Sequence, residues 1–185
     1  TDLSRLNIEY FFKKLSSKKS NIENLFLIAG KSCLDLSGYV NTKEIDEILN
    51  INFFSLMKIV NNFLKINNNF ENIVFASSVA CSRPRARNGI YSTAKIALES
   101  YLTSIQHFLA KTKTKVQIYR LGYMNTDMTK GQDTMLPKAN PDFVAKKIIN
   151  NLNKKTGIIY LPFWWYFIKL IFTNLPWFVF KRLNL

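Results

Sequence analysis

The sequence has few of the residues on which metal sites and disulfide scaffolds depend. It contains two cysteines, Cys33 and Cys81, and a single histidine, His107. The cysteines are isolated and show no Cys-x-x-Cys spacing, so they indicate neither a metal site nor the disulfide framework of a secreted domain. We therefore expect no metal and a reducing, cytoplasmic setting. His107 falls late in an expected helix, where a surface or packing role is favoured over catalysis.

Acidic residues are also scarce, with 12 Asp and Glu against 26 Lys and Arg and a formal net charge of +14. Such a balance can favour nucleic acid or an anionic membrane surface. No block of Lys and Arg alternates with aromatic residues as in a stacking platform, and no zinc-finger or RNA-binding signature occurs. Abundant Lys, Ile and Asn, as in residues 67–69, indicate compositional bias with a general preference for anions. We expect no nucleic-acid partner.

Clustered glycines and long unbroken apolar runs are missing as well. The six glycines are scattered, so no glycine-rich loop is available to bind a phosphate through its backbone N–H groups. A membrane-spanning helix needs about 20 consecutive apolar residues. The most apolar segment, residues 158–183, is interrupted at four positions: Pro162, Lys169, Asn174 and Pro176. The sequence therefore does not predict a span.

The residues that are present form alternating strand and helix patterns over 185 positions, 48% of them hydrophobic, which is enough for one domain with a core. Short apolar runs predict buried strands at 24–30, 72–78, 115–122 and 157–162. Amphipathic periodicity predicts helices at 3–19, 43–66, 91–111 and 141–154. Strands that alternate with helices form βαβ units, so we expect an α/β fold: a doubly wound parallel sheet with helices on both faces.

Small and polar residues follow three of these strands. They are Ala29-Gly30, Ser77-Ser78 and the segment from Gly122 to Thr126. Because ligand sites in such sheets lie at the carboxyl ends of the strands, these residues are expected to meet at one edge.

Tyr91 and Lys95 stand four positions apart at the start of an expected helix, and so lie on one helix face. Ser78 precedes Tyr91 by thirteen residues, at the tip of a strand. A phenol with pKa about 10 is a poor acid–base group near neutrality, and a neighbouring ammonium lowers that pKa. Such a set suits a reaction that moves a proton to or from an oxygen while the adjacent carbon reacts.

These residues resemble the active-site segment of the short-chain dehydrogenases/reductases, which carry a serine followed by Tyr-x-x-x-Lys. The likeness begins with "SSVACSRPRARNGIYSTAK" (77–95) and extends to "LIAG" (27–30), "NINFF" (50–54) and "RLGYMNTDM" (120–128). "TDLS" at the start is similar to the family's aspartate that contacts adenine. The resemblance implies a Rossmann-like fold and NAD or NADP as cofactor.

The resemblance also implies a role for each matching residue. Tyr91 would be the proton donor, Lys95 would lower its pKa and bind the nicotinamide ribose, and Ser78 would position the substrate carbonyl. Asn52 would hold a water that links Lys95 to solvent. The implied cofactor-binding residues are Asp2, Leu3, Ala29, Gly30, Tyr91, Lys95, Gly122, Met124 and Thr126.

The sequence departs from the family pattern in several places. The family begins with two βαβ units and a glycine-rich loop that nothing here matches, so we expect a chain that lacks about 60 residues, at roughly 30 per unit, and that binds dinucleotide poorly. The three smaller departures are Ile28 for an asparagine, Leu121 for a proline, and Cys81 for a glycine.

The end of the chain, residues 158–185, reads as a separate extension of the 1–157 domain, with two short aromatic-rich helices bounded by basic residues. We interpret it as an interfacial membrane anchor, against a cover over the substrate pocket or a dimer contact. With the 77–95 segment, this tail is similar to the family branch that reduces decaprenylphosphoryl-2-keto-ribose. Such a polyprenyl-phosphate substrate would suit the positive charge.

Two arginines, Arg85 and Arg87, lie in the loop between Ser78 and Tyr91 and are candidates to hold a substrate phosphate. The expected function is hydride transfer between a nicotinamide and a carbonyl or alcohol, by a homo-oligomer that contacts the inner face of the membrane peripherally. The alternative is an inactive remnant that binds a partner or a membrane. The helices expected at 43–66 and 91–111 are the faces that the resemblance assigns to the oligomer.

Overall fold

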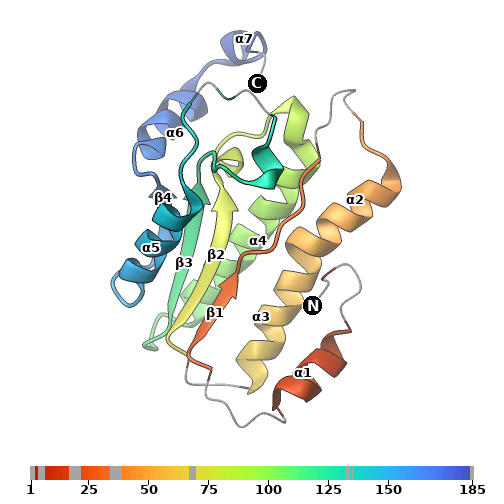
Figure 1. Ribbon diagram of the computed structural model, residues 1–185, viewed down its shortest axis with the longest axis vertical. Helices are drawn as coiled ribbons and strands as arrows, with labels where there is room; N and C mark the ends of the chain where they lie inside the picture. The colour runs from red at the N-terminus through yellow and green to blue at the C-terminus, as the bar shows by residue number, and fades with distance from the viewer. Residues whose placement is uncertain are drawn as a thin grey trace.

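The computed structural model describes residues 3, 7–16, 22–33, 39–66, 70–131, 134 and 136–183. All four predicted strands are present: β1 (Asn24–Leu27), β2 (Asn72–Ser78), β3 (Lys115–Leu121) and β4 (Gly157–Leu161). They form one sheet in the order β1-β2-β3-β4, and every neighbouring pair is parallel (Figure 1). The four carboxyl ends therefore point toward the same edge.

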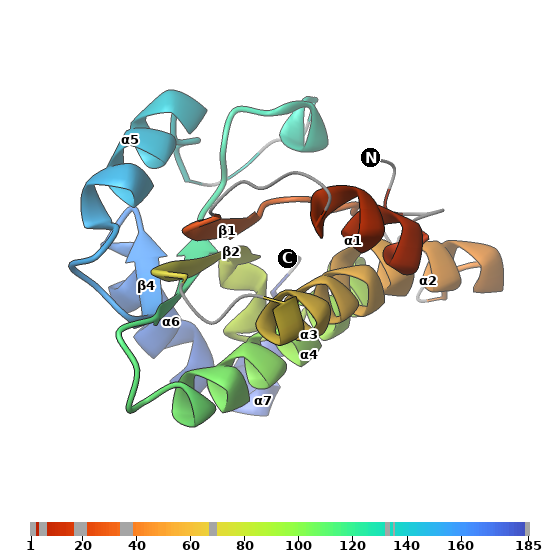
Figure 2. The same ribbon diagram turned by 90° about the horizontal axis from the view of Figure 1, so that it is seen from below.

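Helices connect and cover these strands. The α-helices are α1 (Ile8–Ser16), α2 (Thr42–Leu49), α3 (Ser55–Ile66), α4 (Gly89–Phe108), α5 (Pro141–Asn151), α6 (Trp165–Asn174) and α7 (Trp177–Phe180). Figure 2 shows α3 and α4 on one face of the sheet and α5 on the other. The doubly wound, Rossmann-like α/β fold predicted from the sequence is thus confirmed, including the two short helices of the tail.

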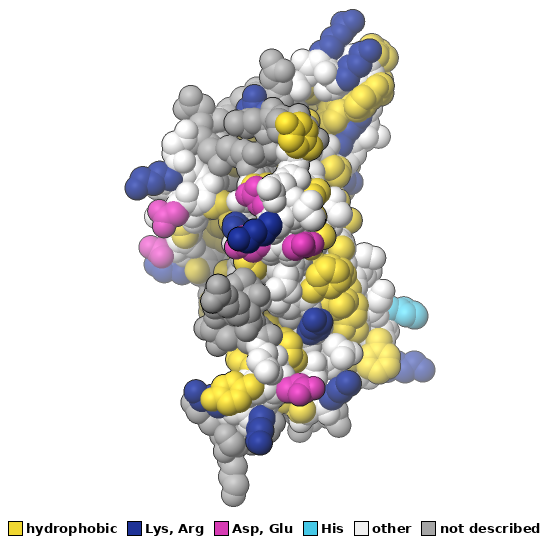
Figure 3. All heavy atoms as spheres, turned by 90° about the vertical axis from the view of Figure 1, so that its right-hand side faces the viewer, with side chains coloured by type: hydrophobic (Ala, Val, Ile, Leu, Met, Phe, Trp, Pro, Cys, Tyr) yellow, Lys and Arg dark blue, Asp and Glu magenta, His cyan; other side chains and the backbone are white. Residues whose placement is uncertain are grey.

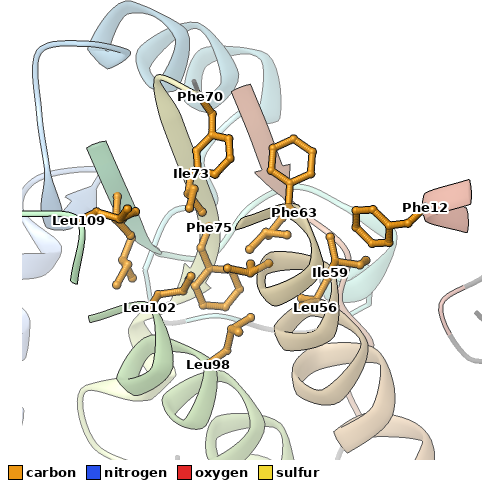
Figure 4. Packing of buried hydrophobic residues seen from close by; sticks show 14 residues of the cluster. Phe12, Leu56, Ile59, Phe63, Phe70, Ile73, Phe75, Leu98, Leu102 and Leu109 are labelled. Carbon is orange, nitrogen blue, oxygen red and sulfur yellow. The ribbon is translucent and has the colours of Figure 1, made fainter. Parts of the chain in front are cut away.

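The alternation of side chains along β2 explains why both faces of the sheet are covered. Ile73 and Phe75 pack into a cluster formed with α3 and α4, in which Phe63 and Leu102 are also buried (Figure 4). Val74, between them in sequence, belongs to a second cluster with three other buried residues: Tyr119, Leu121 and Val144. Successive side chains of a strand point to opposite faces, so a strand buried on both sides reads as one apolar run.

The long helix expected at 43–66 is interrupted. Between α2 and α3 the chain forms a π-helix, η2 (Asn50–Phe54). The side-chain amide of Asn52 donates to the carbonyl of Ile48 at 2.8 Å, the carbonyl to which the backbone N–H of Asn52 would bond in an α-helix. A side chain inserted into this hydrogen-bond ladder widens the turn, and apolar periodicity carries no sign of it.

Residues 158–161 of the tail form most of β4 and so belong to the sheet, and α6 and α7 follow this strand (Figure 1). Within the described part of the chain, no helix is long and apolar enough to cross a membrane.

Candidate active site

The predicted site residues gather where the strands end. Ala29 and Gly30 follow β1, Ser78 is the last residue of β2, and Gly122 follows β3. The register pairs Ser78 with Leu121, so the ends of the two central strands lie level. The expected convergence of these segments at one edge of the sheet is therefore seen.

Asn52, Gly30 and Lys95 form the best-defined part of this edge. The Asn52 side chain is buried and bonds the backbone of Lys31 twice, donating to its carbonyl at 2.8 Å and accepting from its N–H at 3.2 Å. A Cβ on Gly30 would lie 3.1 Å from Oδ1 of Asn52 and 3.2 Å from Nζ of Lys95. The lack of a side chain at residue 30 thus lets both polar groups lie close to the backbone, and a larger residue here would have to displace them.

Lys95 is buried, with 2% of its surface exposed. Its ammonium donates to the carbonyls of Ala76 at 3.1 Å and Ala29 at 3.5 Å, and lies 4.8 Å from the ring centroid of Phe75. Burial lowers the pKa of Lys95 to about 8, against the weaker opposing effects of Cys81 and Glu99. The ammonium is therefore held by neutral groups and lies close to its titration range at neutral pH.

Tyr91 sits one turn before Lys95 on α4 and hydrogen-bonds to Ser78, which joins the start of the helix to the tip of β2. Burial raises the pKa of Tyr91 to about 12, and the bond with Ser78 opposes that rise. The expected lowering of this pKa by Lys95 is not what the arrangement gives. The ammonium points to backbone carbonyls and lies 5.8 Å from the centroid of the phenol ring.

The segment after β3 holds three of the implied cofactor residues. Gly122 is covered by Trp165 of α6, because a Cβ at this position would lie 1.7 Å from the indole Nε1. Met124 pairs with Ala139, and Thr126 begins the short helix η5 (Asp127–Thr129) in a capping box with Thr129. Packing therefore explains the glycine at position 122, and helix capping explains the threonine at position 126, without any ligand.

The other predicted residues lie further out. Leu3 accepts a hydrogen bond from Ser55 of α3 at 3.0 Å, whereas Asp2 lies outside the described residues. Arg87 is exposed in the short helix η4 (Ala86–Asn88). Arg85 donates to the hydroxyl of Tyr123 at 3.3 Å, which connects the loop before α4 to the segment after β3.

Sequence reasoning missed a buried network beneath this loop. The carboxylate of Glu99 accepts from Ser77 at 2.5 Å and from Nη2 of Arg120 at 2.6 Å, and Arg120 also donates to the hydroxyl of Tyr160 at 2.7 Å. Burial alone would lower the pKa of Arg120, but its bonds to Glu99 keep it above the ordinary value. An arginine inside an apolar strand, with an acid four residues after Lys95, is the signal that could have indicated it.

Burial in this region also affects Cys81, which contacts Ser77 at 3.4 Å. Its pKa is raised to about 11, chiefly by burial and then by the charge of Glu99. The thiol therefore stays protonated and behaves as a small packing residue. The described residues include no group of His, Cys, Asp and Glu that could hold a metal ion.

A parallel sheet wound by helices on both faces, with a Ser, Tyr and Lys set at its carboxyl edge, defines an α/β protein of the Rossmann-like class. Within that class, the family model for short chain dehydrogenase matches residues 2–137. The chain belongs to the short-chain dehydrogenase family.

Individual relatives are distant. An uncharacterized oxidoreductase of Staphylococcus epidermidis is 24% identical over 129 residues, which cover 69% of this chain and 56% of the relative. The structure is similar to 3-ketoacyl-(acyl-carrier-protein) reductase from Brucella melitensis complexed with NADH, with a TM-score of 0.73, 18% identity, and coverage of 85% of this chain and 73% of that one. It also resembles angucycline C-6 ketoreductase LanV with bound NADP, at TM-score 0.73 and 16% identity, covering 86% and 70% of the two chains. The chain thus spans little more than half the length of the curated relative.

Proposed function

We propose that this chain carries the catalytic part of an NAD- or NADP-dependent oxidoreductase, which transfers a hydride between the nicotinamide and a carbonyl or alcohol. The observation that supports it best is the buried ammonium of Lys95, 3.2 Å from the position of a Cβ on Gly30 and one helical turn from Tyr91. Burying an ammonium is unfavourable unless it is well bonded. Within the part of the chain that the structure describes, Lys95 donates to the neutral carbonyls of Ala29 and Ala76, which suits a cation kept for a ligand.

The residues present fit the nicotinamide end of such a cofactor. Gly30 has no side chain that would cover Asn52 and Lys95, so a ribose hydroxyl could approach the ammonium and accept from it. When bound, the cofactor would supply or accept the hydride. We propose that the residues holding it are Asp2, Leu3, Ala29, Gly30, Tyr91, Lys95, Gly122, Met124 and Thr126.

In the reductive direction, Tyr91 donates the proton. A pKa raised by burial keeps the phenol protonated at neutral pH, as a donor must be. Ser78, already bonded to Tyr91, orients the substrate oxygen, and Lys95 stabilises negative charge that develops on the phenol oxygen. Asn52 holds Lys31 and its neighbours in place and connects Lys95 to solvent through water.

The proposed substrate is an apolar or lipid-linked carbonyl compound. The most specific candidate is a polyprenyl-phosphate-linked keto-sugar, as in the decaprenylphosphoryl-2-keto-ribose branch. Arg85 and Arg87 lie in the loop that leads into α4 and would bind the phosphate of this substrate. We further propose a homo-oligomer through α3 and α4, whose exposed apolar residues include Ile66 and Phe108.

The experiment is a reductase assay that follows nicotinamide absorbance for the wild type, Tyr91→Phe and Tyr101→Phe, with NADH and NADPH and a series of carbonyl substrates. Tyr101 is the matched control, because it is a partly buried tyrosine on the same helix. Loss of the positioned proton donor should reduce kcat by about 10²–10⁴-fold. Tyr101→Phe should stay within a few-fold of the wild type.

The alternative, an inactive remnant that binds a partner or a membrane, makes a different prediction. It gives no nicotinamide turnover with any substrate and no difference between the two variants. Equal rates for wild type and Tyr91→Phe would refute the proton-donor role, even if turnover were observed.

A further inference from the structure

The outer surface of the tail is apolar. Its exposed side chains, named here the aromatic surface, are Phe163, Tyr166, Phe167, Leu170, Ile171, Trp177 and Phe178. Figure 3 shows hydrophobic side chains together with Lys or Arg side chains at the upper right, the end of the molecule where Figure 1 places α7. A patch of this kind on a protein surface indicates a binding partner.

The pattern along α6 excludes ordinary packing as the reason for these residues. Trp165 is buried with 6% exposed, whereas Phe167 and Ile171, four residues apart on one helix face, are 57% and 62% exposed. A helix that only packs on a domain turns its polar residues outward. The inward face is filled by Trp165, and the outward face is apolar too. Helix α6 therefore has two apolar surfaces, and the described residues cover only one of them.

The charge of the C-terminal segment that contains the aromatic surface points to an anionic partner. Asp142 is the last acidic residue of the sequence. All charged side chains in residues 143–185 are basic: Lys146, Lys147, Lys154, Lys155, Lys169, Lys181 and Arg182. A second copy docked through the same surface would bring Lys181 and Arg182 toward their own equivalents with no acid in the segment to pair them. An anionic lipid surface complements both the charge and the exposed Trp and Tyr side chains.

The length of α6 fixes how it would meet a bilayer. With ten residues it is about 15 Å long at 1.5 Å per residue, half of the roughly 30 Å hydrocarbon core. Such a helix lies in the interface with its apolar face toward the acyl chains.

One arginine fastens this surface to the loop that precedes Tyr91. Nη1 of Arg83 donates to the carbonyls of Phe172 and Leu175, each at 2.6 Å, at the end of α6. The same guanidinium lies 3.7 Å from the ring centroid of Phe180 in α7. Arg83 therefore closes both tail helices onto the segment between Ser78 and Tyr91, so that a surface bound by α6 and α7 lies next to the candidate active site.

We propose that the aromatic surface docks the protein on an anionic bilayer interface. Arg83 joins the docked helices α6 and α7 to the loop between Ser78 and Tyr91. This docking goes beyond hydride transfer and does not require it. It is tested with purified protein and vesicles of phosphatidylcholine alone or with added phosphatidylglycerol, measured by co-sedimentation.

The variant combines Phe167→Ser, Ile171→Ser and Trp177→Ser, and the matched control combines Tyr10→Ser and Tyr39→Ser. The control residues are 66% and 79% exposed; Tyr10 belongs to α1 and Tyr39 precedes α2, so neither is part of the tail. The wild type and the control should bind vesicles that contain phosphatidylglycerol, and more weakly those of phosphatidylcholine alone. Loss of three exposed apolar side chains that would enter the bilayer interface should lower the partition coefficient of the variant by about tenfold or more.

Three outcomes would overturn the proposal. One is that the wild type does not bind anionic vesicles, and another is that variant and control bind equally. The third is that the variant changes only the oligomeric state, measured by light scattering, which would assign the surface to a second copy. Because no step needs turnover, failure here leaves the oxidoreductase proposal untouched, and an inactive enzyme that still binds vesicles leaves the docking intact.

Discussion

Two regions flank the loop from Ser78 to Tyr91, and both depart from the usual arrangement of apolar side chains inside and polar side chains outside. On the inner side, Lys95, Asn52 and Glu99 are polar and buried. On the outer side, the aromatic surface is apolar and exposed. Buried polar groups need bonded partners and exposed apolar patches need a cover. The inner region meets its requirement largely within the chain, whereas the outer one does not, which is why an external partner is assigned to the tail.

The largest expected difference between the regions is in folding stability. Arg120→Met leaves the carboxylate of Glu99 buried with Ser77 as its remaining described partner, since its bonds with Arg120 at 2.6, 3.1 and 3.2 Å are lost. Removing one member of a buried ion pair costs about 3–5 kcal/mol. Urea unfolding followed by circular dichroism should show a loss of this size.

The outer region supplies the control for this measurement. Phe167→Ser with Ile171→Ser removes exposed apolar groups and should change the free energy of unfolding by less than about 0.5 kcal/mol per site. The double variant Glu99→Leu with Arg120→Met should recover much of the loss, because it removes the unpaired charge. If the tail variant lost as much free energy of unfolding as Arg120→Met, the aromatic surface would have to pack within the protein. The contrast between the two regions would then be wrong.

Much of the fold was predictable from local patterns. The residues of β2 and the start of α5 at Pro141 agree with the sequence prediction, because a doubly buried strand and a proline at a helix N-terminus have clear local signals. The edge at which Gly30, Ser78 and Gly122 meet follows from parallel strand order alone. The roles of these residues stay predictions.

What the sequence could not give depends on contacts between distant residues. The π-helix at Asn52 arises from one side chain that bonds a carbonyl one turn back, and the apolar spacing is unchanged by it. The direction of the Tyr91 pKa depends on burial rather than on the four-residue spacing to Lys95. Arg83, in the loop between Ser78 and Tyr91, bonds carbonyls about 90 residues away.

The charge of Lys95 provides the second, smaller test of the inner region. Its folded pKa of about 8 lies below the ordinary value, so the folded state gives up this proton before the unfolded state does. Between about pH 8 and pH 10 the unfolded state binds more protons, and stability therefore rises with pH from this residue. The destabilisation that results from burying the charged Lys95 is complete below about pH 8 and absent above about pH 10.

The measurement compares wild type with Lys95→Met by urea unfolding across this window. The wild type should gain up to about 3 kcal/mol relative to the variant between pH 8 and pH 10, from about 1.4 kcal/mol per pKa unit. Tyr91 acts in the opposite sense only above pH 10, since its pKa is raised to about 12. A constant difference between the two proteins would mean that Lys95 is not desolvated.

The smallest expected effect lies where the two regions meet, at Gly122 and Trp165. A Cβ on residue 122 would come within 1.7 Å of the indole Nε1, an N–H that is buried without a hydrogen-bond partner among the described residues. Gly122→Ala should therefore push Trp165 outward and lower the free energy of unfolding by about 1–3 kcal/mol.

Trp165→Phe provides the complementary variant, because the smaller ring lacks the clashing nitrogen. In a double-mutant cycle, Gly122→Ala should lower the free energy of unfolding by about 1 kcal/mol less in the Trp165→Phe background than in the wild type. Additive effects would instead place the clash elsewhere. If the Gly122→Ala variant also lost vesicle binding while the Arg120→Met variant kept it, the tail would be positioned through Trp165 rather than through the network below, because only the first change displaces α6 directly.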